Sequence, residues 1–120
     1  MKDINELIVK YPKIFQDYPG NPGRVNWDCP TGWLDMVDSH LEKIQNYIGD
    51  NEDLQINCTQ IKEKFAGLRF YYTGGDNAIS DIIINMEKKS DKTCQNCGST
   101  VDVSTIKISG WLTTLCLKCQ

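Results

Sequence analysis

The sequence predicts an α+β fold, in which helices pack on a central β-hairpin or small antiparallel sheet and a cysteine-rich module follows. Three patterns in the 120 residues lead to this prediction. Apolar residues recur at spacings of three and four after Thr31, which is typical of a helix with one buried face. Residues 54–73 combine alternating polarity with a central turn signal, which indicates two paired strands. Two pairs of closely spaced cysteines lie after residue 92.

The composition is that of one globular domain, or of one domain with a small appended module. The net charge of −3 and the pI of about 5.0 argue against a general nucleic-acid coat protein, because such proteins gain affinity from many phosphate contacts. The acidic net charge does not exclude a local basic patch. The N-terminus is charged, and no window approaches the about 20 apolar residues of a membrane span. We therefore expect no signal peptide, no membrane association and a cytoplasmic location.

The N-terminal segment is expected to form a short helix. Asp3 and Glu6 have the character of a capping box in front of a short apolar-periodic stretch. Pro12 ends or kinks this helix. Residues 17–30, which are rich in proline and glycine, are expected to form a fairly long loop.

The main helix is expected to start at Thr31, which can cap it, and to stop at Gly49. Its inward stripe consists of Leu34, Val37, Leu41, Ile44 and Ile48. Residues 54–73 follow as strand, turn and strand. A further helix is expected from about Ala78 to Lys89.

The C-terminal tail holds two Cys-x-x-Cys pairs with 18 residues between them: Cys94 with Cys97, and Cys116 with Cys119. Two cysteines three positions apart on a tight turn can direct both sulfurs at one ion, and two such turns supply the tetrahedral thiolate set of structural zinc. We therefore expect a zinc ribbon over residues 92–120, packed on an α+β core domain of residues 1–91. An iron–sulfur cluster is also held by four cysteines, and the sequence does not exclude it. Disulfides are disfavoured in a reducing cytosol, and a redox pair would not need a second matching pair.

Four bound thiolates leave no open position for water, so the Zn²⁺ cofactor is expected to be structural rather than catalytic. The tail is too short to hold itself together, and its folding should depend on the metal. Residues 101–108 alternate well enough for short strands. Trp111 precedes the second cysteine pair and is expected to clamp the ribbon to the core.

The hairpin is expected to turn at residues 66–67, which places Lys64 directly opposite Arg69. In this register the two faces separate well. The dry face carries Ile61, Phe65, Leu68, Phe70 and Tyr72, with Glu63 as the one exception. Like charges in opposite positions destabilise a strand pair, and a bound anion would reverse that cost.

The wet face supplies the candidate ligand-binding residues: Lys62, Lys64, Arg69 and Tyr71. Cations beside a tyrosine suit a phosphate-bearing ligand or an acidic partner surface. The simpler alternative is a solvated face that is neutralised by the 16 acidic residues of the chain.

An enzyme is the weakest interpretation. The chain has no phosphate-binding glycine loop, no HExxH motif and no nucleophile elbow. The sequence does not exclude a nucleophile–base pair of Cys29 with the single histidine, His40, although a histidine that is packed or on the surface is the commoner case. Asp35 and Asp38 can share a helix face, but solvated carboxylates explain them more simply. We therefore expect that the protein is not an enzyme.

The order of motifs resembles a set of small proteins encoded by phages, prophages and bacterial chromosomes. The stretches that carry this resemblance are YPKIF, TGWLDMVDSHLEKI, QIKEKFAGLRFYY, TCQNCG and GWLTTLCLKC. They span about Tyr11 to Cys119. Ala66 stands where the family usually has a glycine, which implies a slightly different turn. The resemblance implies a phage-related context and a bacterial host cytosol, and it brings no established activity.

The sequence is compatible with two functions of the protein. The first is a phage or prophage accessory protein that acts by binding, as counter-defence proteins do, and captures a host protein or a nucleotide-type signalling molecule. The second is a zinc-ribbon module that binds nucleic acid or regulates transcription, for which the ribbon offers only Lys92, Lys107 and Lys118 as cations. A two-stranded hairpin is marginal alone, so other elements or a second subunit must cover it, and a homodimer stays open.

Overall fold

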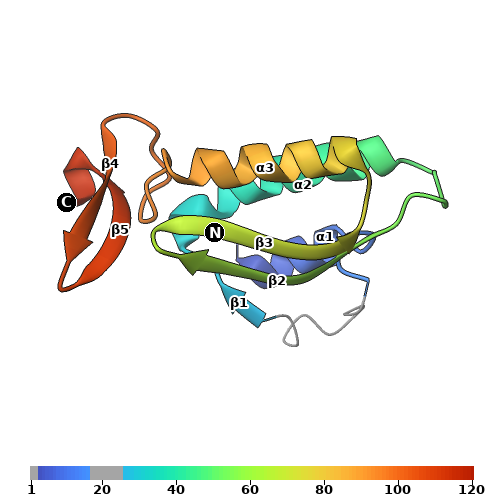
Figure 1. The fold of residues 1–120 in the computed structure, drawn as a ribbon, viewed down its shortest axis with the longest axis horizontal. Coiled ribbons are helices and arrows are strands. Elements are labelled where there is room, and N and C mark those ends of the chain that lie inside the picture. Colours follow the sequence, from blue (N-terminus) through green and yellow to red (C-terminus); the bar gives the residue numbers. More distant parts are fainter. Residues whose placement is uncertain (1–2, 17–25) are drawn as a thin grey trace.

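The structure is a computed structural model and describes residues 3–16 and 26–120. Most of the predicted loop of residues 17–30 lies outside the described residues. Helices pack on a small sheet to form the core, and a separate two-stranded ribbon lies beyond one end of that sheet (Figure 1). The predicted α+β class is therefore confirmed. In the described part of the chain, no helix combines the length and apolarity that crossing a membrane requires.

The core sheet has three strands in the order β1-β2-β3. β2 (Ile56–Lys64) and β3 (Gly67–Gly74) form the predicted antiparallel hairpin. β1 (Asn26–Asp28) adds a short parallel edge beside β2, which the sequence did not predict. Helices α2 (Leu34–Ile48) and α3 (Asn77–Ser90) pack against each other along this sheet (Figure 1).

The first helix, α1 (Ile4–Lys10), begins as predicted at Asp3, whose carboxylate accepts a hydrogen bond from the Glu6 N–H at 2.9 Å. At the other end of the core, Gly49 ends α2 with a φ of +51°, a conformation that glycine adopts at little cost. Both boundaries follow from local sequence chemistry.

The predicted cap at Thr31 is wrong. A short 3₁₀ turn, η2 (Thr31–Trp33), precedes α2, and its first residue provides no side-chain cap. Instead the Trp33 N–H donates to the Pro30 carbonyl at 3.0 Å. This segment contacts the cysteine-rich tail through the hydrogen bond from the Gly32 N–H to the Gln95 carbonyl oxygen at 2.8 Å.

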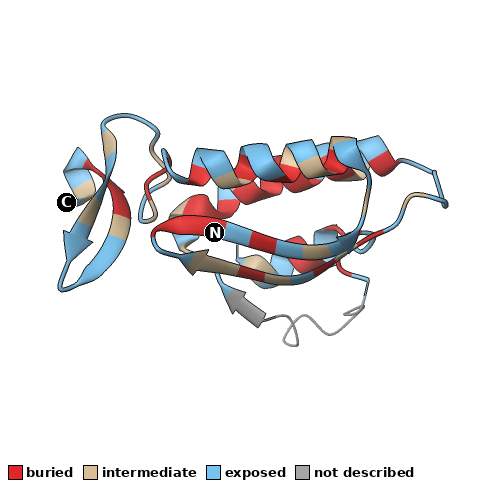
Figure 2. Ribbon diagram, in the orientation of Figure 1, coloured by how far each residue is buried: buried red, intermediate tan, exposed pale blue. Residues whose placement is uncertain are grey.

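A continuous apolar core fills the space between the helices and the sheet (Figure 2). All five residues of the predicted α2 stripe are buried: Leu34, Val37, Leu41, Ile44 and Ile48. From α3 the buried apolar side chains are Ile79, Ile83 and Met86. Each fully buried side chain of this size stabilises the fold by about 1.5–3 kcal/mol before entropy is counted.

Side chains from α3 cover the outer edge of β3. Ser90 Oγ accepts a hydrogen bond from the Leu68 N–H, and Glu87 Oε2 accepts one from the Phe70 N–H, both at 2.9 Å. Glu87 and Ser90 are three residues apart and therefore lie on one helix face. Two edge N–H groups that would invite another strand are thus already satisfied.

The ribbon consists of β4 (Val103–Ile108) and β5 (Trp111–Cys116), joined by a turn in which Ser109 and Gly110 both have positive φ. The predicted clamp at Trp111 is wrong, because its side chain is 77% exposed at the tip of the ribbon. Its position beside the tight turn leaves the indole in solvent rather than buried between ribbon and core.

Candidate metal centre and hairpin face

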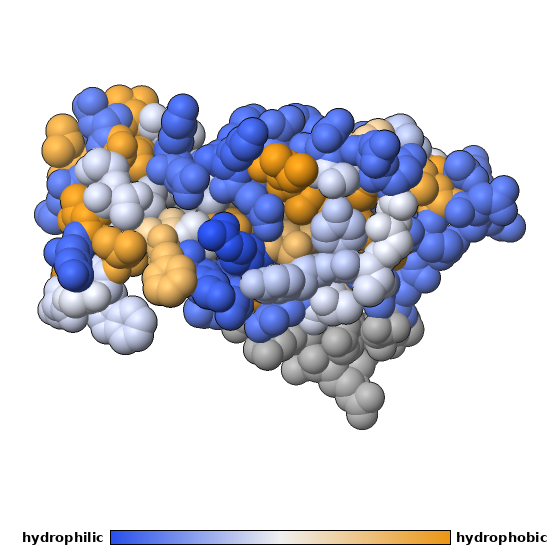
Figure 3. All heavy atoms as spheres, viewed as in Figure 1, coloured by the Kyte–Doolittle hydropathy of each residue, from blue (hydrophilic) through white to orange (hydrophobic). Residues whose placement is uncertain are grey.

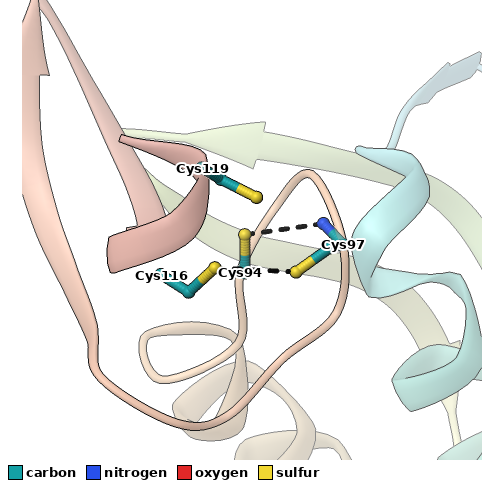
Figure 4. A group of neighbouring side chains, drawn as sticks. All are labelled: Cys94, Cys97, Cys116 and Cys119. Atoms are coloured by element: carbon teal, nitrogen blue, oxygen red, sulfur yellow. Dashed lines mark hydrogen bonds between the residues drawn. The ribbon is translucent and has the colours of Figure 1, made fainter.

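The four tail cysteines converge at the base of the ribbon (Figure 4). Cys94 and Cys97 come from the turn after α3, whereas Cys116 and Cys119 come from the end of β5 and the 3₁₀ turn η3 (Leu117–Cys119). All four Sγ atoms lie within 4.8 Å of one another, and those of Cys97 and Cys116 are 3.6 Å apart. Tetrahedral zinc with Zn–S bonds of about 2.3 Å separates its sulfurs by about 3.8 Å. The four residues therefore have a geometry that can hold a metal ion.

Nearby N–H groups favour negative charge on these sulfurs. The Cys97 N–H donates to Cys94 Sγ at 3.5 Å, and Asn96 Nδ2 donates to Cys119 Sγ at 3.3 Å. Burial opposes ionisation of Cys94, but backbone N–H groups of Cys116, Cys97 and Asn96 outweigh it and lower the pKa of this thiol to about 6. Asn96 favours the Cys119 thiolate too, but the neighbouring Cys116 thiol and burial prevail and raise its pKa to about 11. The neighbouring thiols thus compete for ionisation. A bound divalent cation removes this competition, since all coordinated thiols are deprotonated.

The first cysteine pair is docked against the start of α2 by close backbone contacts. The Gly32 N–H donates to the Gln95 carbonyl oxygen at 2.8 Å. A Cβ atom at Gly32 would lie 2.3 Å from the Cys94 carbonyl oxygen and 2.5 Å from the Gln95 carbonyl carbon. A Cβ atom at Gly98, which has a φ of +81°, would lie 2.8 Å from the Gly32 carbonyl oxygen. The glycines on the two sides of this contact are therefore both required.

Two further hydrogen bonds join the tail to the core. Trp33 is fully buried and donates from Nε1 to the Thr93 carbonyl at 2.9 Å, so it performs the role predicted for Trp111. Thr114 Oγ1 donates to the Ala66 carbonyl at 3.0 Å, which connects β5 to the hairpin turn. The candidate metal centre thus lies at the junction of core and ribbon, between two segments that each contact the core.

The hairpin register differs from the prediction. The turn is formed by residues 65–66, with φ values of +53° and +68°, rather than by residues 66–67. Arg69 therefore lies opposite Lys62, and the predicted pairing of Lys64 with Arg69 is not formed. Two consecutive positive φ values are the signature of the turn that matches the twist of a two-residue hairpin.

The position of the turn also corrects the prediction for Phe65. This residue was assigned to the dry face, but it occupies the turn and is 75% exposed. The hydrogen bond from Thr114 to Ala66 holds the turn from outside the hairpin. Such a long-range contact cannot be read from the hairpin sequence.

The change of register preserves the two faces of the hairpin, because it shifts the pairing by two residues and side chains alternate with period two. Ile61, Leu68 and Phe70 are buried. The outer face carries all four predicted ligand-binding residues: Lys62, Lys64, Arg69 and Tyr71. Lys62 is half-buried and the other three are exposed. Within residues 3–16 and 26–120, none of these three cations forms an ion pair.

A groove of about 460 Å³, which the sequence does not predict, lies between the hairpin turn and the ribbon tip. Its lining includes Lys64, Phe65, Lys107, Trp111 and Leu112. Both aromatic residues had been assigned to buried positions, so nothing placed them together. The available signal was their common position next to a tight turn.

Cys29 and His40 do not form a nucleophile–base pair. Cys29 Sγ contacts the Pro30 carbonyl, and burial, aided by the charge of Asp28, raises the pKa of its thiol to about 12. His40 Nδ1 lies 2.7 Å from the Met36 carbonyl oxygen, and burial lowers the pKa of this histidine. Neither group is poised for nucleophilic attack.

Asp38 is buried rather than solvated. The Lys10 ammonium lies 3.1 Å from Asp38 Oδ1, and the Tyr11 hydroxyl donates to the same carboxylate. These contacts join α1 to α2, which gives Asp38 a structural role.

No protein-family model, curated protein or solved structure matches this chain. The resemblance to phage and prophage proteins therefore stays a prediction from the sequence motifs.

Proposed function

We propose that this protein is a non-enzymatic binding protein of phage or prophage type that captures a phosphate-bearing ligand on the outer face of its hairpin. In this proposal the metal is zinc, it is structural, and the protein acts in the cytoplasm of a bacterial host. Four thiolates leave a bound zinc no open position, which supports a structural role. Capture of an acidic host protein by the same face is the other form of this function.

The observation that carries the proposal is the group of cations on the outer face. Lys62 and Arg69 are direct cross-strand neighbours, and like charges in opposite positions destabilise a strand pair. On its other side Lys62 has Asp28 of β1 as its strand partner, and a bound anion would relieve the remaining repulsion. Neither cation forms an ion pair among the described residues, although the chain as a whole is acidic. A phosphate group brings up to two negative charges and several acceptor oxygens, and an arginine can bind it through two parallel hydrogen bonds. The nearby Tyr71 offers a hydroxyl donor or a ring face.

The test begins with purified protein that is denatured and searched by mass spectrometry for released phosphate-bearing molecules. Calorimetric titration with pyrophosphate then measures the face directly. We expect Lys62→Ala and Arg69→Ala each to weaken binding at least about tenfold, since a charged hydrogen bond contributes about 1.5–3 kcal/mol. Lys43→Ala, which removes an exposed cation from α2, is the matched control and should bind as the wild type does. Absence of any released ligand, together with no pyrophosphate binding, would refute the small-molecule form.

A nucleic-acid-binding ribbon is the second candidate, because all three ribbon lysines are exposed: Lys92, Lys107 and Lys118. A mobility-shift assay across salt concentrations tests it. Binding that weakens steeply as salt rises would favour this candidate, because each neutralised phosphate releases counterions. Salt-independent or absent binding would remove it.

A further inference from the structure

We propose that the groove between the hairpin turn and the ribbon tip binds the base of a nucleotide, so that the captured ligand is a nucleotide. This inference rests on the proposed function of the hairpin face and names its ligand class. Figure 3 shows apolar surface where the ribbon meets the hairpin, with strongly hydrophilic residues directly beside it. The groove volume of about 460 Å³ falls in the range of small-molecule sites.

Two exposed aromatic rings line the groove, one from each part of the molecule. Phe65 is 75% exposed and Trp111 is 77% exposed, the highest values among the large apolar side chains of the described residues. Phe65 has a φ of +53°, a conformation that is unusual for a bulky residue and favours glycine or asparagine. Backbone preference therefore does not explain a phenylalanine there. An aromatic ring held in solvent at the mouth of a groove is explained by a flat ligand that stacks on it.

Phe65 and Trp111 do not stack on each other in the described part of the chain. The Lys64 ammonium lies over one face of the Phe65 ring, so a ligand would stack on the other face. Leu112 adds apolar surface to the lining of the groove. Every nucleobase has two π-faces, and stacking on aromatic side chains tolerates different bases.

Charge in and beside the groove favours one or two phosphates. Lys64 Nζ lies 5.8 Å from the centre of the Phe65 ring, and Lys107 lines the groove from the ribbon. Glu63 contributes one carboxylate, which can accept hydrogen bonds from the amino or imino groups of a base. A long polyanion is disfavoured by so few cations and by the net charge of −3.

The groove continues into the outer face of the hairpin through Lys64. This residue lines the groove and also lies on the same strand face as Lys62 and Arg69. A ligand with its ring beside Phe65 would therefore present a phosphate to these cations. A ring joined to a phosphate is the chemistry of a nucleotide, and neither a base-free phosphate nor an uncharged nucleoside would use both parts of the surface.

The test compares ligands with and without a base on the full-length, zinc-loaded protein. Calorimetry would measure the four nucleoside 5′-monophosphates against ribose 5-phosphate. We expect at least one nucleotide to bind about 5- to 150-fold more tightly, the range that one stacked base supplies. Phe65→Ala and Trp111→Ala should each reduce this advantage and leave ribose 5-phosphate binding unchanged. Phe65→Tyr and Trp111→Phe, which keep a ring, should retain it.

Val101→Ala is the control, because Val101 is a 67% exposed apolar residue of the tail that does not line the groove. Equal binding of nucleotides and ribose 5-phosphate would overturn the inference while leaving the phosphate-binding face in place. Nucleotide preference that survives loss of both rings would overturn it as well. Binding of pyrophosphate but of no nucleotide would also overturn the inference. If neither pyrophosphate nor any nucleotide binds, both the inference and the proposed phosphate-binding function are overturned. Preference for an acidic peptide over all nucleotides would replace the nucleotide by a protein partner.

Discussion

Replacement of Gly32 by alanine should separate the first cysteine pair from the core. The new Cβ atom would lie 2.3 Å from the Cys94 carbonyl oxygen and 2.5 Å from the Gln95 carbonyl carbon. Both are backbone atoms, so no side-chain rotation can relieve the overlap. The turn that carries Cys94 and Cys97 would have to move, and the hydrogen bond from the Gly32 N–H to the Gln95 carbonyl would be lost.

The size of the effect follows from these two changes. Insertion of a methyl group into a tightly packed site costs about 1–3 kcal/mol, and a lost backbone hydrogen bond adds about 1 kcal/mol. We therefore expect a loss of about 2–4 kcal/mol. With a urea dependence of about 2 kcal/mol per molar, the unfolding midpoint falls by about 1–2 M. If the whole cost falls on the metal-bound state, metal affinity drops by about 30- to 700-fold.

Urea unfolding in excess zinc would measure the first quantity, and competition with a chelator would measure the second. Gly67→Ala is the matched control, because the near neighbours of its Cβ atom would be the ends of flexible side chains, Asp91 Oδ1 at 3.3 Å and Arg69 Nη1 at 3.4 Å. The nearest backbone atom, the Lys64 carbonyl oxygen, would lie at an ordinary contact distance of 3.7 Å. This control should change stability by less than about 1 kcal/mol. Wild-type stability and metal affinity in Gly32→Ala would refute the close docking of the cysteine turn on α2.

Three further predictions concern the core and the metal. Chelation of a bound metal should remove hydrogen-exchange protection from the tail and leave α2 and α3 protected, since two of the three buried residues in the ribbon cluster are cysteines of the candidate metal centre. Trp33→Phe should lower the free energy of unfolding by about 2–4 kcal/mol, because it leaves the buried Thr93 carbonyl unpaired and opens a cavity. An unchanged urea midpoint would contradict this prediction. The single histidine, His40, should titrate below its ordinary pKa of 6.5 in an NMR titration, since burial and two nearby lysines disfavour its charge. Its contribution to stability should therefore be complete above pH 6.5 and be lost as the pH falls through the lower pKa of the folded state.

The features that the sequence predicted well depend on short spacings. Cys94 and Cys97 can direct both sulfurs at one point because three residues make one tight turn, and the same holds for the second pair. The α2 stripe is buried because a helix places residues three and four apart on one face. Asp3 and Gly49 mark helix ends through hydrogen bonds and dihedral angles within one turn.

The features that the sequence did not predict depend on partners far away in the chain. Ala66 accepts a hydrogen bond from Thr114, and this contact accompanies a turn one residue earlier than the glycine suggested. Trp33 rather than Trp111 joins tail to core, because its indole reaches the Thr93 carbonyl across 60 positions. No local pattern distinguishes two tryptophans that each follow a glycine.

The sequence by itself determined the class of the fold, the cysteine set that can hold a metal, and the gathering of cations on one hairpin face. These follow from periodicities of two, three and four residues, which fix the direction of each side chain before any packing occurs. The tertiary structure decided which cations are neighbours, which aromatic rings face solvent, and that the hairpin turn and ribbon tip enclose a groove. Those outcomes depend on contacts between segments that the chain brings together only when it folds, such as the approach of Gly32 to the Cys94–Cys97 turn.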